Sequence, residues 1–185
     1  MDEDLQPLIE RLQAACLARH LLVVTAESCT GGGLVDSLTD LPGSSGYVLG
    51  GIVAYADRVK VDQLGVTPAA LAAHGAVSAH VARAMALGAR ARFGADLALA
   101  ITGVAGPDGG TAAKPVGLTY LALAGPDGIE VRRRVWSGDR SANKRSSVRA
   151  AVELLLEAAE ATEATEATEA TGRSDRNEPS SAGVG

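Results

Sequence analysis

Aromatic residues are scarce in this sequence of 185 residues, where they make up 3% of the chain. A core with so few aromatic side chains must be filled by Val, Leu, Ile and Ala, which is typical of a sheet covered by helices. Apolar residues reach 46% of the chain, enough for one sizeable core, and the length favours a single domain. The composition therefore favours an α/β protein.

Concentrated positive charge and long apolar runs are also missing. The formal net charge is -5, and no stripe of Lys and Arg marks a nucleic-acid-binding surface. No stretch reaches about 18 uninterrupted apolar residues, and the segment MDEDLQPLIERLQ is acidic where a secretory signal is basic. We therefore expect no nucleic acid and no membrane among the partners, and a cytoplasmic location.

Cysteine and histidine are too few and too scattered for a metal centre. Cys16 and Cys29 form no disulfide framework or paired ligand motif, which favours a reducing compartment. His20, His74 and His80 also lack the spacing of a metal site or a catalytic triad. We expect neither a metal nor another cofactor.

Strands and helices alternate along the chain. Apolar spacing of three and four residues predicts helices, and short continuous apolar runs predict strands buried on both faces. The turn Gly-Pro-Asp-Gly at 125–128 predicts an antiparallel hairpin, so the sheet is mixed. The predicted helices cover 4–19, the segment after the turn at 28–33, a short segment from Asp57 that carries Lys60, 78–93 and the chain from about 139. The predicted strands cover 21–26, 47–55, 96–101, 116–124 and 129–136.

The C-terminal part of the chain changes in composition. Tandem Glu-Ala-Thr triplets from Glu160 to Thr171 show no apolar face, and a polar end follows them. Such a segment can extend the last helix, but threonine is an indifferent helix former, so disorder is the preferred prediction. We predict one domain over 1–160 and a disordered tail over 161–185.

Two glycine-rich turns follow predicted strands. The turn at 28–33 opens a helix, and the loop Thr102–Gly110 leaves the next buried strand. Free backbone N–H groups in such turns bind phosphate, and those of the second loop can also stabilise an oxyanion. Neither turn matches a nucleotide-binding fingerprint, so purely structural turns remain an alternative.

Ser45 and Lys60 are candidate partners in nucleophilic catalysis. Ser45 lies in a Gly-Ser-Ser-Gly turn, and Lys60 follows after one strand and the start of a helix. A serine hydroxyl needs a base, and a lysine shielded from water can be that base in its neutral form. Tyr55 is placed to hydrogen-bond either group. A turn serine and a solvated lysine are the alternative.

Cations gather where the last helix begins. Arg140, Lys144 and Arg145 follow the segment Ser-Gly-Asp at 137–139. A phosphate can bind there, although a capped helix with solvated charges explains the same pattern.

Several motifs together resemble the CinA C-terminal domain family over about residues 5–158. They are TAESCTGG at 25–32, PGSSG at 42–46, Tyr55 with Lys60, HGAVS at 74–78, TGVAGPDGG at 102–110, KPVG at 114–117 and SGDR at 137–140. The resemblance implies a three-layer α/β/α sandwich and nicotinamide mononucleotide deamidase activity without a metal.

The resemblance also implies roles for particular residues. It assigns the nucleophile to Ser45, the base to Lys60 and a supporting role to Tyr55. We expect the substrate to contact Ser28, Thr30, Gly31, Thr102, Gly103, Gly106 and either Arg140 or Arg145. Some family members carry a further N-terminal domain, and this chain is expected to be the stand-alone, self-associating form.

Two other functions stay open at this point. The fold can bind a nucleotide without turnover, as a sensor linked to DNA uptake or damage. A serine–lysine pair can also hydrolyse a different amide, as a serine amidase or peptidase does.

Overall fold

A five-stranded sheet forms the middle layer of the computed structural model, which describes residues 4–174 and, for side chains, residues 4–161. The strand order is β2-β1-β3-β4-β5. The strands are β1 (Val23–Glu27), β2 (Val48–Val53), β3 (Leu97–Gly103), β4 (Leu118–Gly125) and β5 (Gly128–Val135). β1 pairs in parallel with β2 and β3, whereas β4 is antiparallel to both β3 and β5. The predicted mixed sheet and hairpin are confirmed.

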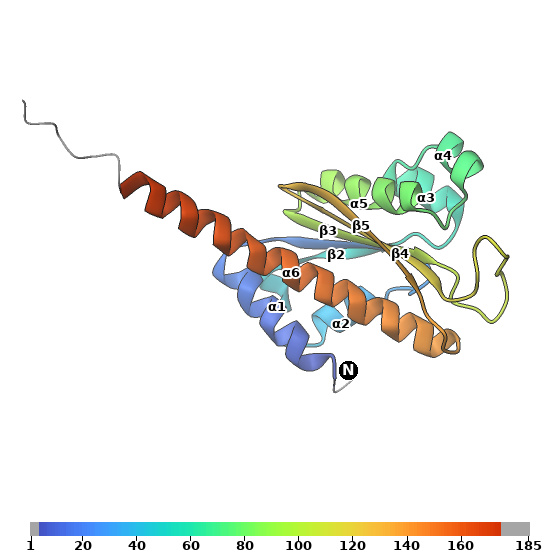
Figure 1. Ribbon diagram of the computed structural model, residues 1–185, viewed down its shortest axis with the longest axis horizontal. Helices are drawn as coiled ribbons and strands as arrows, with labels where there is room; N and C mark the ends of the chain where they lie inside the picture. Colours follow the sequence, from blue (N-terminus) through green and yellow to red (C-terminus); the bar gives the residue numbers. More distant parts are fainter. Residues whose placement is uncertain (1–3, 175–185) are drawn as a thin grey trace, which may run out of the picture.

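Helices cover both faces of this sheet, giving the predicted three-layer α/β/α sandwich (Figure 1). One face carries α1 (Gln6–Ala18), α2 (Gly33–Thr39) and α6 (Arg140–Ser174). The other carries α3 (Asp57–Leu64), α4 (Pro68–His74) and α5 (Ala79–Phe93). A single 3-10 turn, η1 (Ser44–Gly46), precedes β2. Within the described residues no helix is long and apolar enough to cross a membrane.

The two faces of the sheet bury two different kinds of core. Leucines from α1, α2 and α6 fill the first, together with Tyr47. The α5 side is alanine-rich, so that helix lies close to the sheet. Gly88 of α5 allows a similar approach of α3, because a Cβ there would lie 1.8 Å from the carbonyl oxygen of Leu64. This close packing fixes α3, which carries Lys60.

Helix α6 continues to Ser174 and therefore includes the Glu-Ala-Thr triplets. Over this stretch the structure has the helical extension that the composition left open as the alternative to disorder. Alanine and glutamate have high helix propensity, and a helix that is already formed elongates without a new nucleation cost. The predicted tail beyond Ser174 lies outside the described residues, and the domain boundary at 160 stays a prediction.

Candidate functional site

The carboxyl ends of β1, β2 and β3 meet at one edge of the sheet. The chain leaves β1 toward β2 on one side and reaches β3 on the other, which makes β1/β3 a topological switch point. Open α/β sheets bind ligands in the crevice at such a point. Here a cleft of about 290 Å³ lies among the residues that follow these three strands. This cleft is the candidate site.

Residues from four segments line the cleft. Ser28 follows β1, Tyr55 follows β2, Thr102 and Gly103 end β3, and Arg140 begins α6. The full lining is Ser28, Cys29, Tyr55, Asp57, Lys60, Ala76, Val77, Thr102, Gly103, Val104, Ala105, Gly106, Asp108, Gly109 and Arg140. Most of the predicted site residues therefore lie together.

Ser45 does not belong to this group, and its predicted pairing with Lys60 is wrong. Ser45 is an exposed residue of η1, before β2 begins, whereas Tyr55 and Lys60 come after β2 ends. A strand of six residues spans about 20 Å at about 3.3 Å per residue. The two side chains thus lie at opposite ends of the sheet. Ser28 is the serine that shares the cleft with Lys60.

Lys60 is buried and held at a defined position. Its side chain is 1% exposed, and its amine donates to the Tyr55 carbonyl oxygen and to Asp57 Oδ1, each at 3.1 Å. Asp57 itself is 59% exposed. Burial and these two hydrogen bonds hold the Lys60 amine at one place in the wall of the cleft.

Arg140 closes one side of the cleft. Its guanidinium donates to the Gly106 carbonyl oxygen at 2.7 Å and to the Tyr55 hydroxyl at 3.3 Å. These hydrogen bonds connect the start of α6 to the glycine-rich loop and to Tyr55. The other N–H groups of the Arg140 guanidinium stay available to a ligand. Arg145 lines a separate cavity between α2 and α6. The geometry thus places Arg140, and not Arg145, beside the candidate reacting groups.

Thr30 and Gly31 do not line the cleft, and the donors of their turn bind a side chain of the protein itself. The buried carboxylate of Glu27 accepts hydrogen bonds from the Thr30 hydroxyl at 2.6 Å and from the N–H groups of Gly32, Leu34 and Val35. The positive end of α2 is therefore already neutralised by the chain's own carboxylate. These hydrogen bonds favour the alternative of a purely structural turn, and a substrate contact of Thr30 or Gly31 stays a prediction.

This arrangement predicts a strong effect of Glu27 on stability. Glu27→Gln keeps the shape but replaces an acceptor oxygen by a donor that faces backbone N–H groups. We expect a loss of about 2–4 kcal/mol in the free energy of unfolding, measured by urea denaturation. The control is Asp36→Asn, which changes an exposed acid in the first turn of α2. It should lower the free energy of unfolding by less than about 1 kcal/mol. Equal losses in the two variants would contradict this role of Glu27.

Cys29 also lines the cleft but is not a competing nucleophile. Burial raises the pKa of its thiol to about 11, and burial raises the pKa of the Cys16 thiol to about 12. Both side chains are at most 7% exposed. The reactive form of cysteine is the thiolate, so Cys29 is unreactive near neutral pH.

The buried thiols predict a loss of stability in alkali. An unfolded thiol ionises from about pH 9, while the folded protein keeps both protons to about pH 11. The stabilisation is complete below pH 9 and is lost as the pH rises, by about 1.4 kcal/mol per pH unit and thiol. Urea denaturation between pH 8 and 11 measures this effect. The free energy of unfolding should fall less steeply with pH for Cys16→Ala than for the parent chain. An equal fall of the free energy of unfolding in the two proteins would contradict the raised pKa of the Cys16 thiol.

The glycine-rich loop supplies further donors to the cleft. Within the part of the chain that the structure describes, the N–H groups of Gly106, Asp108 and Gly109 have no hydrogen-bond partner. The Thr102 hydroxyl, in contrast, donates to the Ala76 carbonyl oxygen at 2.9 Å and so fixes the segment before α5. Unpaired N–H groups at a cleft can stabilise a developing oxyanion.

The fold and cleft define an α/β sandwich with a polar cleft, the candidate site, at its switch point. The chain belongs to the CinA C-terminal domain family, whose model matches residues 5–159, as the sequence motifs predicted. It is 53% identical over 137 residues to a CinA-like protein of Mycobacterium marinum, covering 74% of this chain and 32% of that protein. The chain spans about a third of the length of the curated relatives it matches.

Solved structures agree with this assignment. Competence/damage inducible protein CihA from Agrobacterium tumefaciens has a TM-score of 0.82 at 40% identity, covering 85% of this chain and 96% of that one. A competence-damaged protein (CinA) superfamily protein from Escherichia coli has a TM-score of 0.80 at 34% identity, with coverages of 84% and 91%. The predicted family and fold are confirmed.

Proposed function

We propose that this chain is an amidohydrolase that converts nicotinamide mononucleotide and water to nicotinate mononucleotide and ammonia in the cytoplasm, in the recycling of pyridine nucleotides. The observation that carries the proposal is the meeting of Ser28, Lys60 and Tyr55 in one cleft at the switch point of the sheet. The choice of substrate rests on the resemblance of the sequence motifs to the CinA C-terminal domain family.

Ser28 takes the role of nucleophile in this proposal. It follows a buried strand directly, in a strand–turn–helix segment, where a side chain is held rigidly at the edge of the sheet. Its residue is 9% exposed, and its hydroxyl has no hydrogen bond among the described residues. The hydroxyl is therefore free to meet both a base and a substrate carbon.

Lys60 acts as the base in its neutral form. A neutral amine has two N–H groups and one lone pair. The Tyr55 carbonyl oxygen and Asp57 Oδ1 accept the two N–H groups, which leaves the lone pair for the proton of Ser28. These contacts and the burial of the side chain are compatible with Lys60 acting as the base.

The reaction proceeds through an acyl-enzyme. Lys60 removes the Ser28 proton while Ser28 Oγ bonds to the carboxamide carbon, and the carbonyl oxygen becomes an oxyanion near the loop N–H groups. The C–N bond then breaks, and the nitrogen leaves as ammonia with the proton that Lys60 returns. Water attacks the ester carbon while Lys60 takes its proton, the bond from the carbon to Ser28 Oγ breaks, and Lys60 returns the proton to Ser28 Oγ as the acid leaves.

Arg140 positions the phosphate end of the substrate. Two of its five N–H groups hold Tyr55 and the Gly106 carbonyl oxygen, and the others can pair with phosphate oxygens. Lys144 lies next to Arg140 along a neighbouring cavity at the start of α6. These cations favour a nucleotide over an uncharged amide.

Ammonia release tests the proposal. The purified chain is incubated separately with nicotinamide mononucleotide, its riboside, free nicotinamide and a peptide amide. Turnover of the mononucleotide, with the riboside at least about 100-fold slower, is the expected result, because a bidentate phosphate contact is lost. Equal turnover of the peptide amide would favour a general serine amidase. Binding of the mononucleotide without ammonia would favour a nucleotide sensor.

A further inference from the structure

Asn143 of α6 is a buried polar residue next to the glycine-rich loop. It is 1% exposed and does not line the cleft. Its Nδ2 donates to the Ala105 carbonyl oxygen at 3.1 Å, and its Oδ1 accepts from the Gly138 N–H at 3.0 Å. An amide side chain has donors on its nitrogen and an acceptor on its oxygen, and both atoms are used here. The residue therefore joins the loop to the segment that leads into α6.

The glycine-rich loop is fixed at few other points beside the cleft. Val104 is still bonded to β4 through its N–H at 2.8 Å. After it come the carbonyl groups of Ala105 and Gly106, which accept from Asn143 and Arg140, the latter at 2.7 Å. Two side chains of α6 thus hold two consecutive carbonyl groups of the loop.

The contact with Asn143 determines which way the next N–H group points. The peptide between Ala105 and Gly106 is trans and planar, so its C=O and N–H groups point in opposite directions. Since the carbonyl oxygen is bonded to Asn143, the Gly106 N–H is directed away from that side chain. Gly106 lines the cleft, and among the described residues its N–H has no hydrogen-bond partner. It is one of the donors that the proposed reaction places near the oxyanion.

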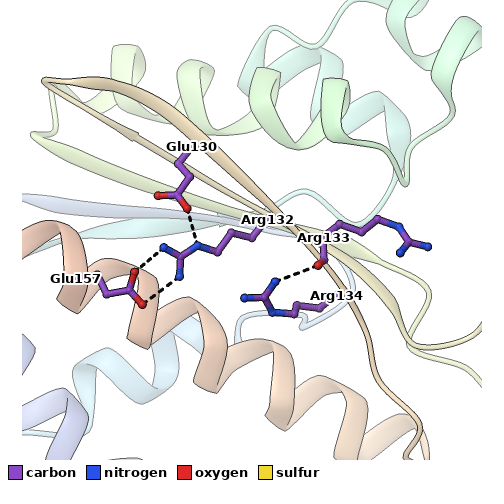
Figure 2. Close-up of polar contacts among 5 residues, drawn as sticks. All are labelled: Glu130, Arg132, Arg133, Arg134 and Glu157. Atoms are coloured by element: carbon purple, nitrogen blue, oxygen red, sulfur yellow. Dashed lines mark hydrogen bonds and ion pairs between the residues drawn. The ribbon is translucent and has the colours of Figure 1, made fainter.

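Helix α6 is anchored independently farther along its length. Figure 2 shows Arg132 of β5 bonded to Glu157 of α6 and to Glu130 of its own strand. These hydrogen bonds raise the pKa of Arg132 and lower the pKa of Glu157. Val152 and Leu155 of the same helix are fully buried in the core. A side-chain change at the start of α6 therefore moves the loop and leaves the helix in place.

We propose that Asn143 is a positioning residue, which orients the Ala105–Gly106 peptide so that the Gly106 N–H stabilises the oxyanion. The inference rests on the proposed function, and Asn143 acts through the loop alone because it does not line the cleft. A carboxylate in its place would still accept from Gly138, but it would face the Ala105 carbonyl oxygen, and two acceptors repel each other. Rotation of the peptide relieves this repulsion and turns the carbonyl oxygen toward the cleft, where it opposes an oxyanion.

The kinetics of ammonia release from nicotinamide mononucleotide test this role. Asn143→Asp should lower kcat by about 100-fold or more, the usual effect of losing one oxyanion donor. KM should stay within about threefold, because Arg140 still holds the phosphate. A kcat within about twofold of the parent value in a folded Asn143→Asp overturns the proposal.

Ser147→Ala is the matched control on the same helix. Ser147 is 1% exposed and lies one turn after Asn143. Among the described residues its hydroxyl bonds to Trp136, Thr119 and the Asn143 carbonyl oxygen, and to no residue of the loop. The variant should lose stability in urea denaturation but keep kcat within about twofold of the parent value. Equal falls of kcat in folded Ser147→Ala and Asn143→Asp overturn the proposal, because buried polar contacts in general would then explain them.

Crystal structures give a readout that needs no activity. The Ala105 carbonyl oxygen should face residue 143 in the parent chain and in Ser147→Ala, and should be turned toward the cleft in Asn143→Asp. An unrotated peptide in Asn143→Asp overturns the proposal. A parent chain that releases no ammonia contradicts the proposed function instead, and the crystal structures then decide the orientation of the peptide by themselves.

Asn143→Ala replaces Asn143→Asp if the latter does not fold. It removes the hydrogen bond to Ala105 without adding a repulsion, so the peptide should occupy two orientations in the crystal structure. We expect kcat to fall by about 10-fold, as the loss of one hydrogen bond predicts. A single parent-like orientation together with an unchanged kcat overturns the proposal.

Discussion

Ser28→Ala is expected to reduce ammonia release from nicotinamide mononucleotide by about 10⁴-fold or more, with an unchanged fold. The hydroxyl is the only group lost, and among the described residues it makes no hydrogen bond that the folded state needs. Removing a nucleophile leaves only the rate that binding and the oxyanion donors supply. The measurement is kcat/KM from an ammonia assay, with circular dichroism to verify folding.

Ser45→Ala is the matched control for this variant. Both changes remove one serine hydroxyl near a glycine-rich turn, but Ser45 lies at the far end of β2. We expect the activity of Ser45→Ala to stay within about twofold of the parent chain. The reverse pattern, with Ser45→Ala inactive and Ser28→Ala active, contradicts the proposed reaction centre.

Lys60→Met is expected to lower kcat by about 10²–10⁴-fold, the usual contribution of a general base. Methionine fills the buried space of the lysine stem, so the loss reflects the missing amine. Stability should change little, since an apolar side chain replaces the buried lysine and the exposed Asp57 stays solvated. The effect should fall on kcat more than on KM, because the amine acts during bond formation.

Arg58→Met is the control for Lys60→Met. Arg58 is an exposed basic residue two positions earlier on α3 and does not line the cleft, so its replacement tests for a general effect of removing a basic side chain from this helix. Its kcat should stay within about twofold of the parent value. If both variants lose activity to the same degree, the effect comes from charge on α3, and Lys60 is not the base.

The sequence predicted the sheet and most of its helices because each depends on local patterns. Continuous apolar runs marked β1 and β3, and the Gly125–Gly128 turn marked the hairpin. Helix α4 was not predicted, because its seven residues include no buried one and so show no apolar face.

The proposed nucleophile could not be found from spacing along the chain. Ser45 and Lys60 are close in sequence, but β2 lies between them, and a strand carries the chain from one end of the sheet to the other. Ser28 and Thr102 are far apart in sequence, yet both lie at the carboxyl ends of strands of one parallel pair. Asking which residues come directly after buried strands would have identified Ser28, because parallel strands bring their carboxyl ends together.

Glu27 shows another limit of motif interpretation. A glycine-rich turn before a helix predicts an anion site, and an anion is indeed bound there, but it is the side chain of Glu27. Sequence alone does not reveal whether the donors of such a turn serve a ligand or the chain itself.

The most direct test of the site is the position of a covalent label. The chain is treated with a serine-reactive fluorophosphonate, digested and mapped by tandem mass spectrometry, with and without excess nicotinamide mononucleotide. We predict one adduct, on Ser28, which the nucleotide suppresses and which Lys60→Met slows. An adduct on Ser45, or labelling that persists at full rate in Ser28→Ala, would contradict a reaction centre at the carboxyl ends of β1 and β3.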